Sequence, residues 1–191
     1  MESHSKHGDS IWWHADDTLM VNLFIPSRVT WQERGAQLEM NTGYPYDGVV
    51  NVKVSSLRKP QTFAVALRVP GWAKNPQLTV NGKPVETRTD SGYLIVRRRW
   101  REGDAVAFTL PLELRLEPTP GDETTIAVLR GPMVLAADLG PAQQPFEAAA
   151  PALVGADLLA DFKPVEPQQA IYRAGTVARP SALTFTPFYK N

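Results

Sequence analysis

The stretch GYLIVRRRWREGDAVAFTLPL, from Gly92 to Leu112, decides the fold class of this chain. Two runs with alternating apolar residues, 93–97 and 105–110, lie on either side of the segment WREGD. Alternation with a period of two places successive side chains on opposite faces of a β-strand, and Gly and Asp favour a tight turn between strands. The stretch therefore predicts two antiparallel strands with a buried face.

Similar strand patterns recur along the chain at intervals of roughly 10 residues. The stretch AVLRGPMVLAADLG, Ala127 to Gly140, holds two of them around a Gly-Pro turn, and Asn81-Gly82 is a strong signal for a two-residue hairpin. No segment has the pattern of a long amphipathic helix. The sequence thus predicts an all-β protein, an antiparallel, jelly-roll-like β-sandwich. The expected strands are 11–14, 19–25, 29–31, 36–41, 49–54, 62–69, 78–80, 84–88, 93–97, 105–110, 114–117, 125–129 and 133–137.

Composition divides the chain into three expected segments. Residues 1–10 are polar and predict a flexible N-terminal segment, and 11–140 hold the β-sandwich domain. Residues 141–191 are rich in Ala and Pro, with weak strand signals and a last strand at 183–188. We expect them to form an irregular, meandering C-terminal lobe that packs on the sandwich.

Charge and cysteine content exclude several function classes. The 191 residues hold 20 Lys plus Arg and 20 Asp plus Glu, and this balance argues against nucleic acid or an anionic membrane as the main partner. The basic run RRRWR at 97–101 lies in a predicted strand, so its side chains alternate between faces and should be solvated or ion-paired. No apolar run approaches the roughly 20 residues of a membrane span. The absence of cysteine removes disulfides, thiolate nucleophiles and cysteine-based zinc sites.

Few side chains are candidates for chemistry. His4 and His7 have the spacing of a metal pair on a helix, but a flexible polar terminus is the better explanation, because the segment contains Gly8 and has no apolar face. Asp16-Asp17 is an acidic doublet at a predicted hairpin turn, where Asp is favoured for its local hydrogen bonds. We therefore expect no catalytic residue, no metal site and no cofactor in this chain.

Aromatic side chains are the better candidates for ligand contact. Trp12, Trp13, Tyr44 and Tyr46 could stack on sugar rings, although packing in the core or against another domain is the competing explanation. Trp12 and Trp13 are adjacent in a predicted strand, so they should point to opposite faces.

An ordered series of motifs resembles a known family. It looks like the region after the catalytic barrel in β-L-arabinofuranosidase-type glycoside hydrolases, family 127 and its relatives. Each motif is weak alone, but the collinear series covers nearly the whole chain. The motifs are WWHADDTLMVNLFIPS at 12–27, GYP at 43–45, ALRVPGW at 66–72, VNG at 80–82, GYL at 92–94, WREGD at 100–104, LRGP at 129–132 and PFY at 187–189.

The resemblance implies a larger parent enzyme. In the family an (α/α)6 barrel carries catalysis, with a cysteine nucleophile held by zinc and a glutamate acid/base. This chain has no cysteine, so we expect it to be a truncated fragment of such a bacterial enzyme and catalytically inert alone. Glu2 and His4 would lie near the parent's active site.

The expected role is a non-catalytic accessory module that supports the catalytic barrel and could line its substrate cleft. A free-standing carbohydrate-binding module for plant-type glycans, using Tyr44, Tyr46 and exposed tryptophans, is the main alternative. A complete small hydrolase using Glu2, Asp16 or Asp17 is a third. An exposed apolar edge could also support a homodimer. Localisation stays open between the cytoplasm and the periplasm or exterior, the latter requiring an upstream signal.

Overall fold

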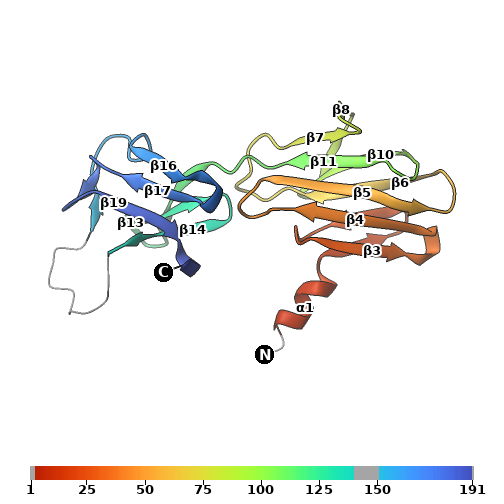
Figure 1. The fold of residues 1–191 in the computed structure, drawn as a ribbon, viewed down its shortest axis with the longest axis horizontal. Helices are drawn as coiled ribbons and strands as arrows, with labels where there is room; N and C mark the ends of the chain where they lie inside the picture. The colour runs from red at the N-terminus through yellow and green to blue at the C-terminus, as the bar shows by residue number, and fades with distance from the viewer. Residues whose placement is uncertain (1–2, 140–150, 191) are drawn as a thin grey trace. The chain divides into compact units, whose positions relative to one another are not determined.

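The computed structural model describes residues 3–139 and 151–190. The chain divides into two compact units, Met1–Pro111 and Leu112–Asn191, which are described separately (Figure 1). Both are built from short strands, and within the described ranges the only α-helix is α1 (Ser3–Asp9). The all-β prediction is confirmed.

Two sheets make up the first unit. The first sheet has the strand order β1-β2-β6-β10-β9 and the second has the order β3-β4-β5-β11-β7-β8. Every pairing is antiparallel except β2 with β6, which is parallel. The bounds are β1 Trp12–Ala15, β2 Thr18–Val21, β3 Ser27–Trp31, β4 Ala36–Thr42, β5 Val49–Leu57, β6 Gln61–Arg68, β7 Gln77–Val80, β8 Lys83–Pro84, β9 Arg88–Asp90, β10 Tyr93–Trp100 and β11 Ala105–Thr109.

The two sheets share one apolar core. Alternate residues of the central strands face inward, as on β6, where Phe63, Val65 and Leu67 have no exposed surface. The fully buried Trp100 stacks on Phe63 with ring centroids 5.7 Å apart, and its indole N–H donates to the Phe63 carbonyl at 3.0 Å. A buried indole needs such an acceptor, because an unpaired N–H away from water is costly. This packing makes the unit a β-sandwich.

Turn chemistry fixes the register of the hairpins. Ala15 pairs with Thr18 across Asp16-Asp17, and Val80 pairs with Lys83 across Asn81-Gly82. Asn81 and Gly82 both have positive φ, 52° and 76°, as a two-residue hairpin turn requires. Both turns lie where the sequence predicted them.

The second unit forms a single curled sheet with a small satellite. The main order is β12-β13-β14-β19-β17-β16, and β15 pairs with β18. Its inner face packs apolar side chains such as Phe162 and Phe185, with ring centroids 4.9 Å apart. The bounds are β12 Leu114–Thr119, β13 Asp122–Arg130, β14 Met133–Asp138, β15 Ala152–Leu153, β16 Phe162–Glu166, β17 Ile171–Ala174, β18 Ala178–Arg179 and β19 Leu183–Pro187.

The two units divide the chain differently from the expected segments. The structure separates at Pro111, whereas the sequence predicted one sandwich through residue 140. β14 hydrogen-bonds to β19, so the strands after Leu112 share a sheet with the C-terminal strands. Alternation of apolar residues marks a strand and its buried face but not its partner. Likewise Ser3–Asp9 forms helix α1 where a flexible segment was expected.

Candidate functional site

Trp12 and Trp13 point to opposite faces of the first sheet, as predicted. The Trp12 ring packs against the core, and its indole N–H donates to the Ser27 hydroxyl at 2.9 Å. Trp13 is 49% exposed on the outer face. Only Trp13 therefore presents its ring to solvent in the way a ligand platform needs.

Tyr44 lines a cleft at one end of the sandwich. The Tyr44 ring meets Phe24 edge-on, with centroids 5.3 Å apart, and packs against the core. Burial raises the pKa of the Tyr44 hydroxyl, and the positive charge of Arg68 opposes that shift. Tyr46 follows in the same loop, where its backbone N–H donates to the Gly43 carbonyl at 3.0 Å.

We call this cavity the Tyr44 cleft. Its volume is about 400 Å³, and its walls are mostly apolar. Arg68 closes one side, held by a 2.7 Å hydrogen bond from its Nε to the Asn22 carbonyl. Ile25, 40% exposed, forms an apolar rim. The lining residues are His7, Leu23, Phe24, Ile25, Tyr44, Pro45 and Arg68.

The four aromatic residues nominated from the sequence do not form one binding platform. Trp12 is turned toward the core, Trp13 lies on the outer face, and Tyr44 lies in the cleft. Direct sugar contact by any of them stays a prediction. Sequence reasoning did not identify Leu23, Ile25 and Arg68 as cleft residues, because strand alternation marked them only as parts of half-buried strands.

The N-terminal candidates near the parent's active site are only partly described. Glu2 lies outside the described residues, and His4 lies in helix α1. His7, in the last turn of that helix, lines the Tyr44 cleft. Their predicted proximity to an active site stays a prediction.

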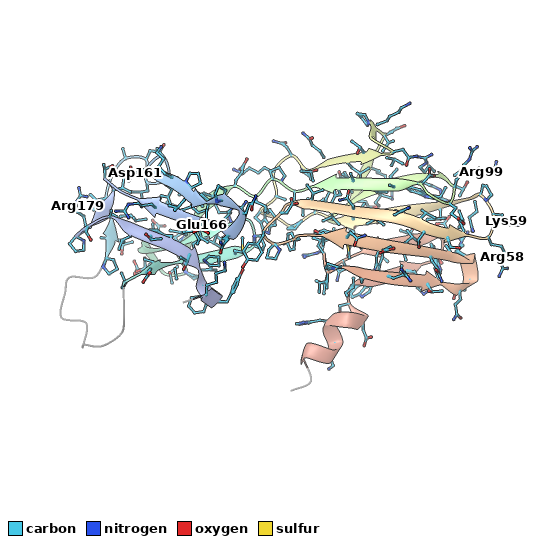
Figure 2. The ribbon with its side chains drawn as sticks, in the orientation of Figure 1. Arg58, Lys59, Arg99, Asp161, Glu166 and Arg179 are labelled. Atoms are coloured by element: carbon cyan, nitrogen blue, oxygen red, sulfur yellow. The ribbon has the colours of Figure 1, made fainter. Side chains whose placement is uncertain are left out.

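The arginine run is used mainly for structure. Arg97 forms an ion pair with Asp17 across the first sheet, and this bond lowers the pKa of the Asp17 carboxyl. Arg98 lies over the Trp100 ring at 5.2 Å and within 3.7 Å of the Asp104 carboxylate. Arg99 is exposed at the sandwich end that also carries Arg58 and Lys59 (Figure 2). The predicted solvated or ion-paired strand is what forms.

The residues present do not fit the zinc centre that the family resemblance implies. The chain has no cysteine, and no group of three His, Asp or Glu side chains within the described part of the chain could hold a metal. We therefore derive no chemistry through a metal. Among the helices of residues 3–139 and 151–190, none has the length and apolar character to cross a membrane.

Comparison with known proteins decides the family of the sandwich. Residues 18–112 match the family model described as beta-L-arabinofuranosidase, GH127 middle domain. This segment is a GH127 middle domain. The matched residues cover the first unit from β2 to its end, so the family resemblance inferred from the sequence is confirmed. No curated protein matches the chain.

Solved structures share the fold of this chain within much longer chains. A GH127 beta-L-arabinofuranosidase from Geobacillus stearothermophilus T6 has 23% identity and a TM-score of 0.66 over 97% of this chain and 33% of its own. A glycoside hydrolase has 22% identity and a TM-score of 0.67, over 94% of this chain and 34% of its own. A GH127 beta-arabinofuranosidase has 23% identity and a TM-score of 0.65, over 94% of this chain and 33% of its own. The chain thus spans about a third of the length of these structures.

Proposed function

We propose that this chain is a non-catalytic accessory part of a GH127-type glycoside hydrolase, in which its sandwich supports a separate catalytic barrel. The observation that carries the proposal is the match of residues 18–112 to a middle domain, within a chain one third as long as the similar structures. The barrel would supply the nucleophile, the acid/base and any metal.

The Tyr44 cleft is the surface best suited to that barrel. Its walls are mostly apolar, and Ile25 and Tyr44 both contribute apolar surface. Covering such surface with another domain removes apolar area from water, worth about 25 cal/mol per Å². A sugar cleft would instead need several convergent polar groups, whereas four of the seven lining residues of this cleft are apolar: Leu23, Phe24, Ile25 and Pro45.

The acidic doublet Asp16-Asp17 is poorly suited to act as a catalytic pair. Asp16 and Asp17 occupy the β1–β2 turn, and Asp17 is committed to Arg97. A glycosidase needs two carboxyl groups facing each other across a sugar, one of them free to exchange a proton. The hydrolase alternative using this doublet is therefore the less favoured.

The Ile25→Glu substitution tests the docking surface. We expect it to reduce hydrolysis of an aryl β-L-arabinofuranoside several-fold in a protein that joins a GH127 catalytic barrel to this chain, because a carboxylate would be buried in the contact. Since Ile25 is 40% exposed, the unfolding free energy of the 191-residue chain should change little.

Val134→Glu is the matched control. Val134 is 45% exposed and lies on β14 of the second unit, so the same change of chemistry is made at a residue that does not line the cleft. Equal effects of the two substitutions on activity would refute the assignment of the cleft as the docking surface.

A further inference from the structure

The outer face of the first sheet carries a second depression, which we call the outer-face trough. Its volume is about 410 Å³, within the range typical of small-molecule sites. It shares no lining residue with the Tyr44 cleft. The accessory role proposed above does not involve it. The lining residues are Thr18, Ala64, Glu86, Thr87, Arg88, Ile95 and Arg97.

Alanines on β6 lie beneath the outer face, and one of them, Ala64, lines the trough. Ala64 and Ala66 on β6 alternate with the core residues of that strand, so their methyl groups face outward. Their neighbours in register carry larger side chains: Ala64 lies between Thr18 and Arg97, and Ala66 between Met20 and Ile95. The small side chain of Ala64, only 3% exposed, leaves a hollow between Thr18 and Arg97, and the partly exposed Ile95 adds apolar surface to it.

Polar groups with defined partners form the walls. Arg97 is held by Asp17, and Arg88 by Asp90 at 3.0 Å. A guanidinium carries five N–H donors, so each arginine keeps donors for a ligand. Glu86 adds an acceptor. The carboxylates of Glu86, Asp17 and Asp90 balance the positive charges of the two arginines. The trough therefore disfavours an anionic ligand.

Trp13 extends the same face. It is in register with Met20, which is in register with Ala66 and Ile95, so these side chains form a row across four strands. Two strand spacings place Trp13 about 10 Å from Ala66. Trp13 is 49% exposed and offers an aromatic surface beside the trough.

We propose that the outer-face trough binds a neutral saccharide of one or two rings. The apolar C–H face of a ring would pack against the partly exposed Ile95, while its hydroxyls pair with Arg88, Arg97 and Glu86. The trough is lined by both apolar and polar side chains. This combination suits a sugar, which presents apolar and hydrogen-bonding surfaces on one ring, better than a purely apolar or a charged molecule. The proposal does not depend on docking to a barrel.

A titration of the full 191-residue chain tests the site. L-arabinose, D-galactose and D-galacturonate are added separately, and backbone amide shifts are followed by NMR. We expect the neutral sugars to move the amides of residues 86–88 and 95–97. Arg88→Ala should weaken their binding about tenfold, as expected for losing hydrogen bonds from a charged donor.

Arg28→Ala is the matched control. The side chains of Arg28 and Arg88 are 62% and 74% exposed, and each pairs with one carboxylate, but Arg28 lies on β3 of the other sheet. We expect Arg28→Ala to bind the neutral sugars like the parent chain. Three results would overturn the proposal: no amide shifts at the trough residues, tighter binding of galacturonate than of the neutral sugars, or an equal loss of sugar binding in Arg28→Ala and Arg88→Ala.

Discussion

Asp104 links two turns of the sandwich, and its removal should be costly. Its carboxylate accepts hydrogen bonds from the Arg101 backbone N–H at 2.9 Å and from the Asn81 side-chain amide at 2.8 Å. Arg98 lies 3.7 Å away, and the Asp104 side chain is only 10% exposed. Asn81 in turn accepts from the Ala105 backbone N–H at 2.9 Å. One carboxylate thus joins the turn after β10 to the β7–β8 hairpin.

The magnitude follows from the two hydrogen bonds to a charged acceptor. Each contributes about 1.5–3 kcal/mol, so Asp104→Ala should lower the unfolding free energy of the first unit by about 3 kcal/mol, taking the lower value for each. Asp104→Asn keeps an acceptor oxygen and loses the charge, so about half of that loss is expected. The exposed Asp90, with a side chain 51% accessible, provides a control, because Asp90→Ala should change stability by less than about 0.5 kcal/mol.

Stability should also depend on pH through this group. Burial raises the pKa of Asp104, but hydrogen bonds from Asn81 and Arg101, together with nearby arginine charges, outweigh it and hold the pKa below its usual value. A lowered folded-state pKa gives stabilisation that is complete above the unfolded-state pKa of about 3.9 and is lost as pH falls through the folded-state pKa. The stability difference between the parent chain and Asp104→Asn should therefore shrink below pH 4.

Urea unfolding followed by tryptophan fluorescence measures these effects selectively. All five tryptophans lie within residues 12–100, so the signal reports the first unit alone. A loss below about 0.5 kcal/mol for Asp104→Ala, or a difference from Asp104→Asn that stays constant as the pH is lowered, would refute the reasoning.

Two further predictions concern the sandwich core and the second unit. Trp100→Ala should cost about 3–5 kcal/mol because it empties a fully buried site, whereas Trp13→Ala at a 49% exposed position should cost less than about 1 kcal/mol. Urea unfolding of both variants checks this pair, and similar losses would contradict the assignment of faces. In the second unit, Asp161 accepts from the backbone N–H groups of Val177 at 3.2 Å and Gly175 at 2.7 Å, which lowers its pKa. Asp161→Ala should therefore speed amide hydrogen exchange at Gly175 while leaving tryptophan-monitored unfolding unchanged, and unaltered exchange there would count against it.

Local patterns predicted the strands and turns of the sandwich well. The alternation around Phe63 and the Asn81-Gly82 pair each encode a local conformation, and both appear as expected. The parallel pairing of β2 with β6 was not predictable in this way, because alternation marks a face and not a neighbour. The same limit explains why β14 was expected in the sandwich although it pairs with β19.

The candidate sites were harder to predict than the fold. The Tyr44 cleft joins residues from α1, the segment after β2, the β4–β5 loop and the end of β6, and nothing local in the sequence brings them together. The outer-face trough depends on Ala64 lying between the larger Thr18 and Arg97 on adjacent strands. Only the pairing register shows that Ala64 lies between these two side chains.

The central claim is that this GH127 middle domain acts with a separate catalytic barrel. The most direct test compares hydrolysis of an aryl β-L-arabinofuranoside, with zinc and reductant present, by the 191-residue chain and by a protein joining a GH127 catalytic barrel to it. We predict activity only in the joined protein, since the chain has no cysteine to serve as nucleophile. Hydrolysis by the 191-residue chain alone would contradict the account.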